Sequence, residues 1–526
     1  MAKKFKILCP SNVELLKVYH KLVTNKRVGK SEILENLLKT RPIRSLSGIV
    51  NISVLTTPYA CPGKCLYCPT EKGIPKSYVS GEPAVERAKR LKFNPYLQVK
   101  KRIEMLKAEG HPTDKVELRI VGGTWSYYPQ SYQSWFIKRC FDACNENSKI
   151  KSRAEQGEAR RLSPFASLEQ MRRSLSDHQK LEEVQKKNER AKHRIVGLSI
   201  ETRPDFVNEE EIKWLRRLGV TMVELGVQSI YDDILKKNLR GHGIRETILA
   251  TKLLKDVGFK ILYQMMPNLP GSNLKRDEMM FKELFQSPDF QPDLLKIYPC
   301  ALLKEAPLYK LWKTGKYKPY TEKQLIDFIK SVKQKIPYYV RIQRITRDIP
   351  SQKIVEGGAK ISNLRQILIE KMKNEGWRCH CIRCREVREK YNPKEEIYLF
   401  REDYEASDGK EIFLSFENKK RTKLYSLLRL RISKWNEKYS RFIFPVLNGA
   451  AIIREVHTYG ELVPISEMKI APQHRGLGKK LIKEAEKIAK KKFGLNKIVI
   501  ISAVGVRDYF RKLGYFLKNT YMVRNL

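Results

Sequence analysis

The sequence predicts an α/β fold in two parts: an incomplete (β/α)6 barrel followed by a smaller α+β domain. Six short runs rich in aliphatic and β-branched residues indicate the first part, at 49–55, 116–121, 195–201, 221–227, 259–266 and 294–299. The amphipathic segments between them are long enough for crossover helices, so we expect a parallel sheet. Closely spaced strand-like runs from about residue 396 indicate the second part. A doubly wound open sheet is the competing topology for the first part.

The segments outside the two expected sheets are basic or densely charged. Residues 1–45 place apolar side chains at helical spacing and predict a basic helical extension. Residues 151–193 have the charge density that is typical of a solvated helix face. The expected parts are therefore the extension at 1–45, the barrel at 46–335, a linker at 336–394 and the second domain at 395–526.

The excess of positive charge points to a polyanionic partner. The 526 residues include 104 Lys and Arg against 58 Asp and Glu, a formal net charge of +46. Self-repulsion of this size works against compactness, and a nucleic acid would offset it. A lysine-rich surface adapted to high temperature is the alternative, although that adaptation usually raises Lys and Glu together.

Membrane and secretory signals are missing from the sequence. It holds no run of eighteen apolar residues, and its basic N-terminal stretch lacks an apolar core and a cleavage site. Six of the ten cysteines fall in two tight clusters, which favours metal binding in a reducing compartment over disulfides. We therefore expect a cytoplasmic protein that does not associate with membranes.

The first cysteine cluster has the spacing C-x3-C-x2-C and consists of Cys61, Cys65 and Cys68. It follows the first expected strand, at the end where parallel α/β sheets hold their ligands. Three thiolates can ligate three irons of a [4Fe–4S] cluster and leave the fourth iron open. A structural zinc site normally needs four ligands, and the nearby sequence offers no fourth Cys or His. An iron–sulfur cluster is therefore favoured over zinc.

This cluster resembles that of the radical S-adenosylmethionine (SAM) enzymes. The resemblance implies that SAM chelates the open iron and is cleaved to a 5′-deoxyadenosyl radical. It also implies that Tyr67 lies beside the adenine of SAM, and that Gly122 and Gly123 lie near its amino group. Polar residues at later strand ends are expected to join the same site: Glu201, Arg203, Glu224 and Gln228.

A second motif, Gln473-x-Arg475-Gly476-x-Gly478, stands between a strand and the long helix pattern GKKLIKEAEKIAKKK. Glycines at a helix N-terminus let backbone N–H groups approach a pyrophosphate. The motif resembles the acyl-CoA cradle of the GCN5-related N-acetyltransferases, which implies that residues 473–478, Leu477 included, hold acetyl-CoA. The same resemblance implies that Tyr509 lies near the thioester. A helix cap without a ligand is the alternative.

A third cluster, of Cys379, Cys381 and Cys384, predicts a structural zinc site. Two residues compete as the fourth ligand. Cys300 follows the sixth expected strand and has no other evident role, whereas His380 is flanked by two ligating cysteines. We expect Cys300 to be the ligand. A second iron–sulfur cluster is the remaining alternative.

Taken together, these features resemble the family of Elongator catalytic subunits in its stand-alone archaeal form. The resemblance runs from about residue 41 to residue 526 and is carried by motifs such as CLYCP, VELRIVGGTW, ETRPD, ELGVQS, KIYP and REVHTYG. It implies an acyltransferase that uses SAM-derived radical chemistry and acetyl-CoA. The product would be a carboxymethyl group on C5 of wobble uridine-34 in tRNA.

The family resemblance also implies roles for individual residues. Lys115 would contact acetyl-CoA from the barrel side, and Tyr309 and Tyr509 would position the acetyl group or act in thioester hydrolysis. A short run in the second domain would hold the cofactor: Glu455, Val456, His457 and Thr458. The tRNA anticodon stem-loop would bind a basic cleft, with contacts from 1–45 and 338–344. The enzyme would need an electron-donor protein, and a homodimer is left open.

Two other functions fit parts of the sequence. A protein lysine acetyltransferase with a structural iron–sulfur domain would use the second motif, with Glu455 or His457 as general base. A non-catalytic tRNA-binding scaffold would account for the charge but would leave both cofactor motifs without a role.

Overall fold

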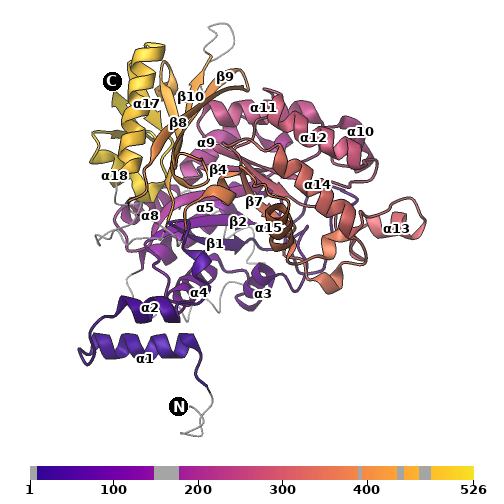
Figure 1. Cartoon of the computed structure of the whole chain (residues 1–526), viewed down its shortest axis with the longest axis horizontal. Coiled ribbons are helices and arrows are strands. Elements are labelled where there is room, and N and C mark those ends of the chain that lie inside the picture. The colour runs from indigo at the N-terminus through magenta and orange to yellow at the C-terminus, as the bar shows by residue number, and fades with distance from the viewer. Residues whose placement is uncertain (1–8, 147–176, 389–391, 393, 435–442, 461–475) are drawn as a thin grey trace.

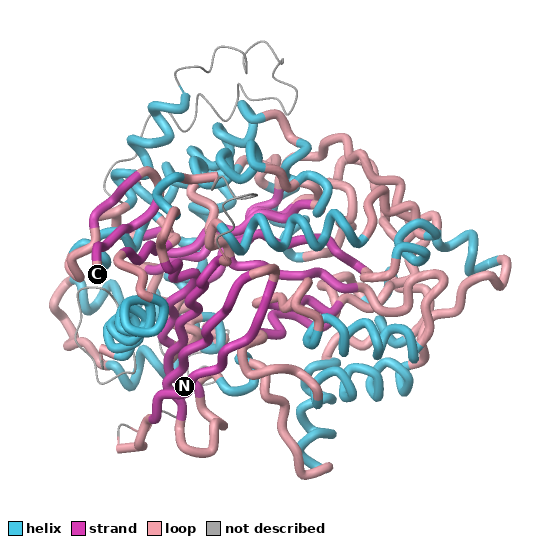
Figure 2. The backbone as a smooth tube through the Cα atoms, turned by 90° about the horizontal axis from the view of Figure 1, so that it is seen from above, coloured by secondary structure: helices cyan, strands magenta, loops and turns pink. Residues whose placement is uncertain are grey.

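The computed structural model describes residues 9–146, 177–388, 392, 394–434, 443–460 and 476–526. Two seven-stranded sheets form its framework, with the second sheet drawn in orange and yellow in Figure 1. Seen from above, the strands run through the middle of the molecule and most helices lie outside them (Figure 2). The predicted α/β architecture of two unlike parts is confirmed.

The first sheet is parallel, and its spatial order follows the sequence order. A doubly wound sheet would reverse its strand order, so that alternative is excluded. β4 and β6 are buried along their whole length, as expected of strands covered on both faces. All six predicted strands form: β1 Val50–Leu55, β2 Lys115–Val121, β3 Arg194–Thr202, β4 Met222–Gln228, β5 Lys260–Met265 and β6 Leu294–Ile297.

A seventh strand, β7 (Arg341–Ile345), continues the first sheet beside β6. It falls within 336–394, the segment expected to be a linker. In its sequence, RIQRI, only the two isoleucines are buried. Arg341 and Arg344 line a cavity, so this strand lacks the continuous apolar run that marks the other six.

Helices connect the strands of the first part, and each buries an apolar stripe against the core. Asparagine side chains cap α4, α9 and α12 at their N-termini. Of the charged segment 151–193, residues 177–188 form a helix, and residues 151–176 lie outside the described ranges. The helices are α3 Pro83–Arg90, α4 Pro95–Ala108, α5 Gln130–Asn145, α8 Asp177–Asn188, α9 Glu209–Leu218, α10 Asp232–Lys237, α11 Ile244–Asp256, α12 Leu274–Gln286, α13 Leu308–Lys313, α14 Glu322–Gln334, α15 Leu364–Asn374 and α16 Ile382–Arg385.

The second sheet is mixed, because β11 and β12 are parallel and its other neighbours are antiparallel. β11 pairs with β12 only over residues 451–453, although it continues along β10 to residue 458. The two parallel strands therefore separate and leave a wedge between them. The elements are β8 Tyr398–Ala406, β9 Gly409–Glu417, β10 Leu424–Ser433, β11 Ala451–Thr458, α17 Leu477–Phe493, β12 Lys497–Ile500, α18 Arg507–Arg511, β13 Phe516–Lys518 and β14 Tyr521–Asn525.

Buried ion pairs join the two parts. Arg454 on β11 pairs with Asp293, which precedes β6, and with Glu411 on β9 at 2.8 Å. Arg431 on β10 pairs with Asp256 at the end of α11, at 2.6 Å. Because charges removed from water need their partners, these contacts hold the two sheets in one relative position.

The N-terminal helices lie apart from the two sheets in Figure 1. α1 (Asn12–Thr24) and α2 (Glu32–Leu38) pack through a small cluster of Leu16, Tyr19 and Leu38. The prediction of helices in 1–45 is confirmed within the described residues. Among the helices in the described ranges, none is long and apolar enough to span a membrane.

Candidate active site

The cysteine loop follows β1 and carries Cys61, Cys65 and Cys68. At Gly63 a Cβ atom would lie 3.0 Å from Arg203 Nη1 and at ordinary contact distance from Cys65 Sγ (3.5 Å) and Cys61 Sγ (3.7 Å). Two of the three sulfur atoms thus lie close to Gly63. Burial alone would raise the pKa of Cys65, but the charge of Arg240 lowers it. The thiolate that a metal requires is therefore favoured.

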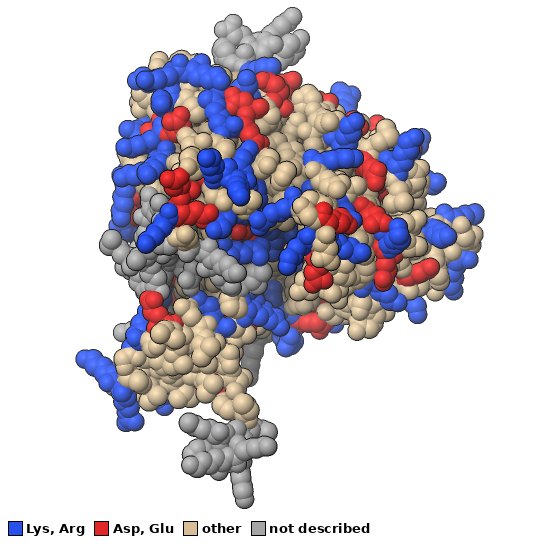
Figure 3. Space-filling model, in the orientation of Figure 1, with Lys and Arg blue, Asp and Glu red and all other residues tan. Residues whose placement is uncertain are grey.

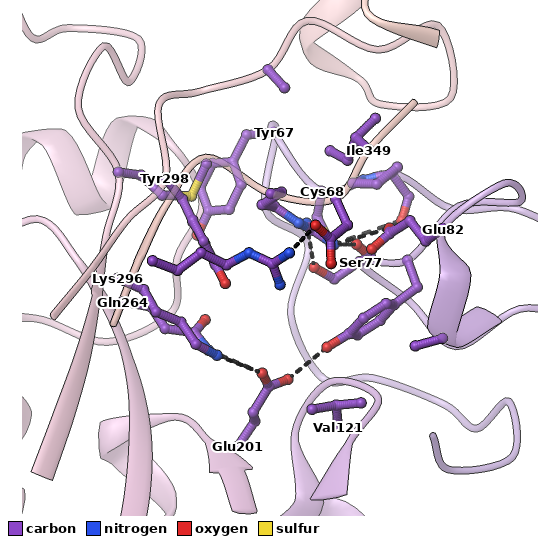
Figure 4. Close-up of a pocket in the computed structure, with 18 of the residues that line it drawn as sticks. Tyr67, Cys68, Ser77, Glu82, Val121, Glu201, Gln264, Lys296, Tyr298 and Ile349 are labelled. Atoms are coloured by element: carbon purple, nitrogen blue, oxygen red, sulfur yellow. Dashed lines mark hydrogen bonds and ion pairs between the residues drawn. The ribbon is translucent and has the colours of Figure 1, made fainter. Parts of the chain in front are cut away.

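A cavity at the carboxyl ends of the strands opens beside this loop (Figure 4), and we call it the cysteine-loop cavity. Tyr67, Glu201 and Gln228 line it, as the sequence predicted. The Oε1 atom of Gln228 is buried and accepts no hydrogen bond from any described residue. Glu201 accepts hydrogen bonds from Tyr78 at 2.9 Å and from Gln264 at 3.2 Å (Figure 4). The unsatisfied amide oxygen suits a ligand that donates a hydrogen bond.

The other residues expected to bind SAM support the cavity from its edges. Gly122 has φ +140°, and a Cβ there would lie 1.9 Å from Thr56 Oγ1, so only glycine fits this turn. Gly123 also has positive φ, +102°. Arg203 is held by Asp205 at 2.7 Å. Gly122, Gly123 and Arg203 are not among the described residues that line the cavity.

A buried charge cluster forms part of the cavity wall, and the sequence analysis missed its two cations, Arg119 and Lys296. Lys296 pairs with Glu224 and, at 3.2 Å, with Glu201, while Arg119 pairs with Glu224 at 2.7 Å. Burial alone would lower the pKa of Lys296, but Glu224 raises it above its usual value, so the ammonium group stays charged. The available signal is Lys296, the one polar residue of the otherwise apolar strand β6 (LLKI).

A second cavity, of about 570 Å³, lies in the wedge beside β11, and we call it the cradle cavity. Lys115 reaches it from β2 of the first sheet. The remaining predicted residues come from the second domain: Glu455, Val456, His457, Thr458, Gly476, Gly478 and Tyr509. These residues are far apart in the sequence and are all expected to hold acetyl-CoA. The fold brings them together around one cavity.

Gly478 lies in the first turn of α17 and packs closely against its neighbours. A Cβ at this position would lie 3.4 Å from the hydroxyl oxygen of Tyr509 and 3.6 Å from Val456 Cγ1. The Tyr509 hydroxyl is therefore held at the helix N-terminus, where free N–H groups and the helix dipole favour an anion.

The remaining cradle residues differ in what the structure shows. Gly476 is the N-cap of α17 and has φ +67°. Leu477 directs its side chain into the core, so any contact with a cofactor would come from its backbone. Gln473 and Arg475 lie outside the described residues.

Glu455 is held by cations from both domains. Lys260 on β5 donates to it at 3.1 Å, and Arg429 on β10 at 2.9 Å. Burial alone would raise the pKa of Glu455, but Lys260 and Arg429 lower it to about 2. His457 Nε2 lies 2.7 Å from the backbone oxygen of Ser47, and burial lowers the pKa of His457. The Glu455 carboxylate is therefore a poor proton acceptor.

A third cavity, of about 610 Å³, shares lining residues with each of the other two, and we call it the bridging cavity. Arg and Lys outnumber Asp and Glu along its walls, consistent with the many basic side chains on the face shown in Figure 3. It shares lining residues with the cysteine-loop cavity: Arg119, Arg344, Arg347 and Asp348. It shares others with the cradle cavity: Ile49, Glu117, Lys260, Glu455 and His457.

The third cysteine cluster forms a compact sulfur site. The Sγ atoms of Cys379, Cys381 and Cys384 all lie within 4.8 Å of one another, around the start of α16. Lys333 on α14 lies 3.6 Å from Cys384 Sγ. Three sulfur donors at this separation fit zinc, which prefers tetrahedral thiolate coordination.

Cys300, the expected fourth ligand, is not grouped with the three sulfur atoms of this site. Its side chain belongs to a separate apolar cluster that includes Cys65 and Tyr67, and burial raises its pKa to about 12. The loop after β6 turns toward the cysteine loop and away from α16. His380 is not part of the sulfur site either, because its ring stacks on Tyr338 at 4.5 Å.

Tyr309 stands in α13, which extends away from the two sheets in Figure 1. Its ring stacks on Trp312 at 5.4 Å and packs against the apolar cluster that includes Cys65 and Tyr67. It is not among the described residues that line the three cavities, and its expected role at the acetyl group stays a prediction.

Two protein-family models match the first part of the chain. The model of the Radical SAM superfamily matches residues 55–284, and that of the Radical SAM C-terminal domain matches residues 292–374. The second match includes β7, in agreement with its place in the first sheet. Radical SAM proteins use SAM and a [4Fe–4S] cluster, and the cysteine loop with the adjoining cavity fits both groups.

Relatives extend the similarity over nearly the whole chain. The tRNA uridine(34) acetyltransferase of Methanocaldococcus infernus is 45% identical, over 98% of this chain and 92% of the relative. Elongator complex protein 3 of Homo sapiens is 37% identical, over 94% of this chain and 87% of the relative. The solved structure of M. infernus Elp3 with an N-terminal deletion (1–46) has a TM-score of 0.74 at 42% identity and covers 92% of this chain and 100% of its own. The chain therefore belongs to the family of tRNA uridine(34) acetyltransferases and Elongator complex protein 3.

Proposed function

We propose that this enzyme places a carboxymethyl group on C5 of wobble uridine-34 in tRNA, with SAM and acetyl-CoA as co-substrates. Relatives named tRNA uridine(34) acetyltransferase support the choice of substrate. The observation that carries the proposal is the bridging cavity, which shares walls with both expected cofactor sites. A base that enters it would meet both cofactors.

The reaction explains why one chain needs both sites. Uridine C5 is not an amine nucleophile, so ordinary acyl transfer would not attach acetate through its methyl carbon. A bound [4Fe–4S] cluster and SAM supply a radical that can remove a hydrogen atom from that methyl group. Cys61, Cys65 and Cys68 would hold the cluster, while Tyr67, Glu201 and Gln228 would bind and orient SAM.

The cradle cavity would present acetyl-CoA to the bridging cavity. Gly476 and Gly478 leave the N-terminus of α17 open to the pyrophosphate. Lys115 would bind from the opposite domain, and the Tyr509 hydroxyl would position the acetyl group beside Gly478. Zinc at the third cysteine cluster would tie the segment between the domains to the first sheet.

The lysine acetyltransferase alternative lacks support from the site. It requires a general base close to the thioester. Glu455 has a pKa of about 2 and is held by two cations, and His457 already contacts the backbone of Ser47. The residues that suggested this alternative are thus engaged elsewhere.

One anaerobic incubation tests the proposal. Reconstituted enzyme is mixed with tRNA, SAM, acetyl-CoA and a chemical reductant, and nucleosides are analysed by mass spectrometry. We expect 5-carboxymethyluridine together with 5′-deoxyadenosine. Acetyl-lysine in a protein substrate without 5′-deoxyadenosine would instead support the alternative.

A further inference from the structure

Several arginines of the bridging cavity have carboxylate partners, but two near the third cysteine cluster do not. Arg365, at the start of α15, and Arg383, in α16, line this cavity and form no ion pair with any residue in the described ranges. Their neighbours are neutralised by Glu386 or Asp348: Arg341, Arg344 and Arg388. Near the third cysteine cluster, Arg365 and Arg383 are therefore the arginines of this cavity without an ion pair to a described residue.

Arg383 is the less satisfied of the two. Its Nε atom is buried and donates no hydrogen bond to any described residue. A buried N–H group without an acceptor is unfavourable unless a ligand supplies one. Such a group indicates a ligand-binding position.

Arg365 adds a second donor to the same region. One of its Nη atoms donates to the backbone oxygen of Ile342 at 3.3 Å, which leaves most of its five N–H groups for other acceptors. Planar guanidinium groups bind phosphate oxygens in pairs of hydrogen bonds, so two of them suit a phosphodiester.

The third cysteine cluster would orient Arg383. This residue stands between Cys381 and Cys384, two of the three sulfur donors. A metal held there would fix the four-residue helix α16 and with it the direction of the Arg383 side chain. This role would explain why the expected zinc site lies next to residues that line the bridging cavity.

Two phosphate sources are available, the RNA backbone and coenzyme A. The glycines at the N-terminus of α17, where the pyrophosphate is expected, line the cradle cavity and are not among the residues of the bridging cavity. We propose that Arg365 and Arg383 form a phosphodiester site. This site binds the backbone phosphate of tRNA that lies next to the nucleotide entering the bridging cavity. This inference rests on the proposed function.

The test is a double-mutant cycle in which an arginine of the protein and a phosphate of the RNA are neutralised separately and together. An anticodon stem-loop carries a methylphosphonate at each linkage around uridine-34 in turn, and its affinity is measured for the wild type, Arg383→Gln and Arg388→Gln. We expect one linkage to cost the wild type roughly tenfold in affinity, because a charge-assisted hydrogen bond is lost. The same linkage should cost Arg383→Gln clearly less, because only Arg365 then remains to contact the phosphate. Arg388→Gln, which removes an equal charge from a paired arginine, should keep the full effect.

Salt dependence gives a second readout of the same contact. For Arg383→Gln, the slope of log Kd against log salt concentration should become shallower by about 0.7, the value for one contact to single-stranded nucleic acid. Arg383→Lys should restore most of the slope but not the full affinity. Zinc content and thermal unfolding should match the wild type, which confirms that the variant folds.

Distinct outcomes overturn the proposal. It fails if no linkage shows the coupling with Arg383, or if Arg383→Gln weakens acetyl-CoA and leaves RNA binding unchanged. The coupling experiment needs no turnover, so it is separate from the proposed reaction. Coupling without 5-carboxymethyluridine would uphold the phosphate site and refute the function. Formation of 5-carboxymethyluridine without coupling would refute the phosphate site and uphold the proposed function.

Discussion

Lys260 on β5 and Glu455 on β11 form an ion pair of 3.1 Å across the boundary between the two sheets. Both residues line the cradle cavity and the bridging cavity. Arg429 donates to the same carboxylate, so the wall shared by the two cavities is a charge network with members from both domains. The shape of the space between the two expected cofactor sites therefore depends on how the two sheets pack together.

We expect loss of one partner of this pair to destabilise the protein. Lys260→Met leaves a buried carboxylate with one fewer cation, which should lower the free energy of unfolding by about 3 kcal/mol. Urea unfolding measures this cost. The exposed pair Lys252–Asp408 is the matched control, and Lys252→Met should cost less than about 1 kcal/mol. Equal costs for the two variants would show that the buried pair does not hold the domains together.

The affinity for acetyl-CoA should depend on pH through Lys115. Burial lowers the pKa of Lys115 to about 8, so its charge is present at neutral pH and is lost as the pH rises through 8. Calorimetric titration should therefore show weaker binding at alkaline pH for the wild type. Lys115→Arg should remove this dependence because arginine stays charged, and Lys115→Met should bind weakly throughout. A flat wild-type profile would exclude Lys115 as a cofactor contact.

The same shift makes a prediction for stability. The unfolded chain keeps this lysine protonated up to its usual pKa of 10.5, whereas the folded chain releases the proton near 8. Between these values the unfolded state binds more protons, so the free energy of unfolding should rise with pH. The rise should be smaller in Lys115→Met, and urea unfolding at several pH values would show the difference.

Metal analysis should separate the two cysteine sites. Cys381→Ser should lose zinc while retaining the iron held by the first cysteine cluster, because the two sites use different residues. Inductively coupled plasma mass spectrometry gives both contents on the same sample. Cys300→Ser is the informative control, since its thiol lies in another cluster and zinc should be retained. Zinc loss in Cys300→Ser would restore it as the fourth ligand.

Arg240 should set the reduction potential of the cluster. Its Nη1 atom lies 3.6 Å from Cys65 Sγ, and its Nε atom is 2.9 Å from His242 Nε2. Hydrogen bonds and positive charge near a ligating sulfur favour the reduced cluster. Arg240→Gln should therefore shift the midpoint potential to more negative values in a titration followed by electron paramagnetic resonance. The exposed Arg245→Gln should leave it unchanged, and an equal shift in both would contradict a local effect.

Predictions from the sequence succeeded where the signal lies in a few consecutive residues. The six apolar runs predicted six strands because buried parallel strands need continuous apolar sequence. β7 was missed because its arginines face a cavity, and Lys296 was missed because one polar residue in KIYP does not change the strand pattern. Cys300 and Tyr309 follow β6 in the sequence, and the fold packs both against the apolar cluster that includes Cys65 and Tyr67, which the sequence does not show.

The sequence by itself determined the two-part α/β architecture, the three local clusters and the family, since hydrophobic period and ligand spacing are properties of short segments. Only the tertiary structure decided that Lys115 shares a cavity with Glu455 and Tyr509, and that Arg365 and Arg383 line the space between two cofactor sites. The physical reason is that such neighbours are separated by hundreds of residues. Their proximity comes from the packing of one sheet against the other, which no local pattern encodes.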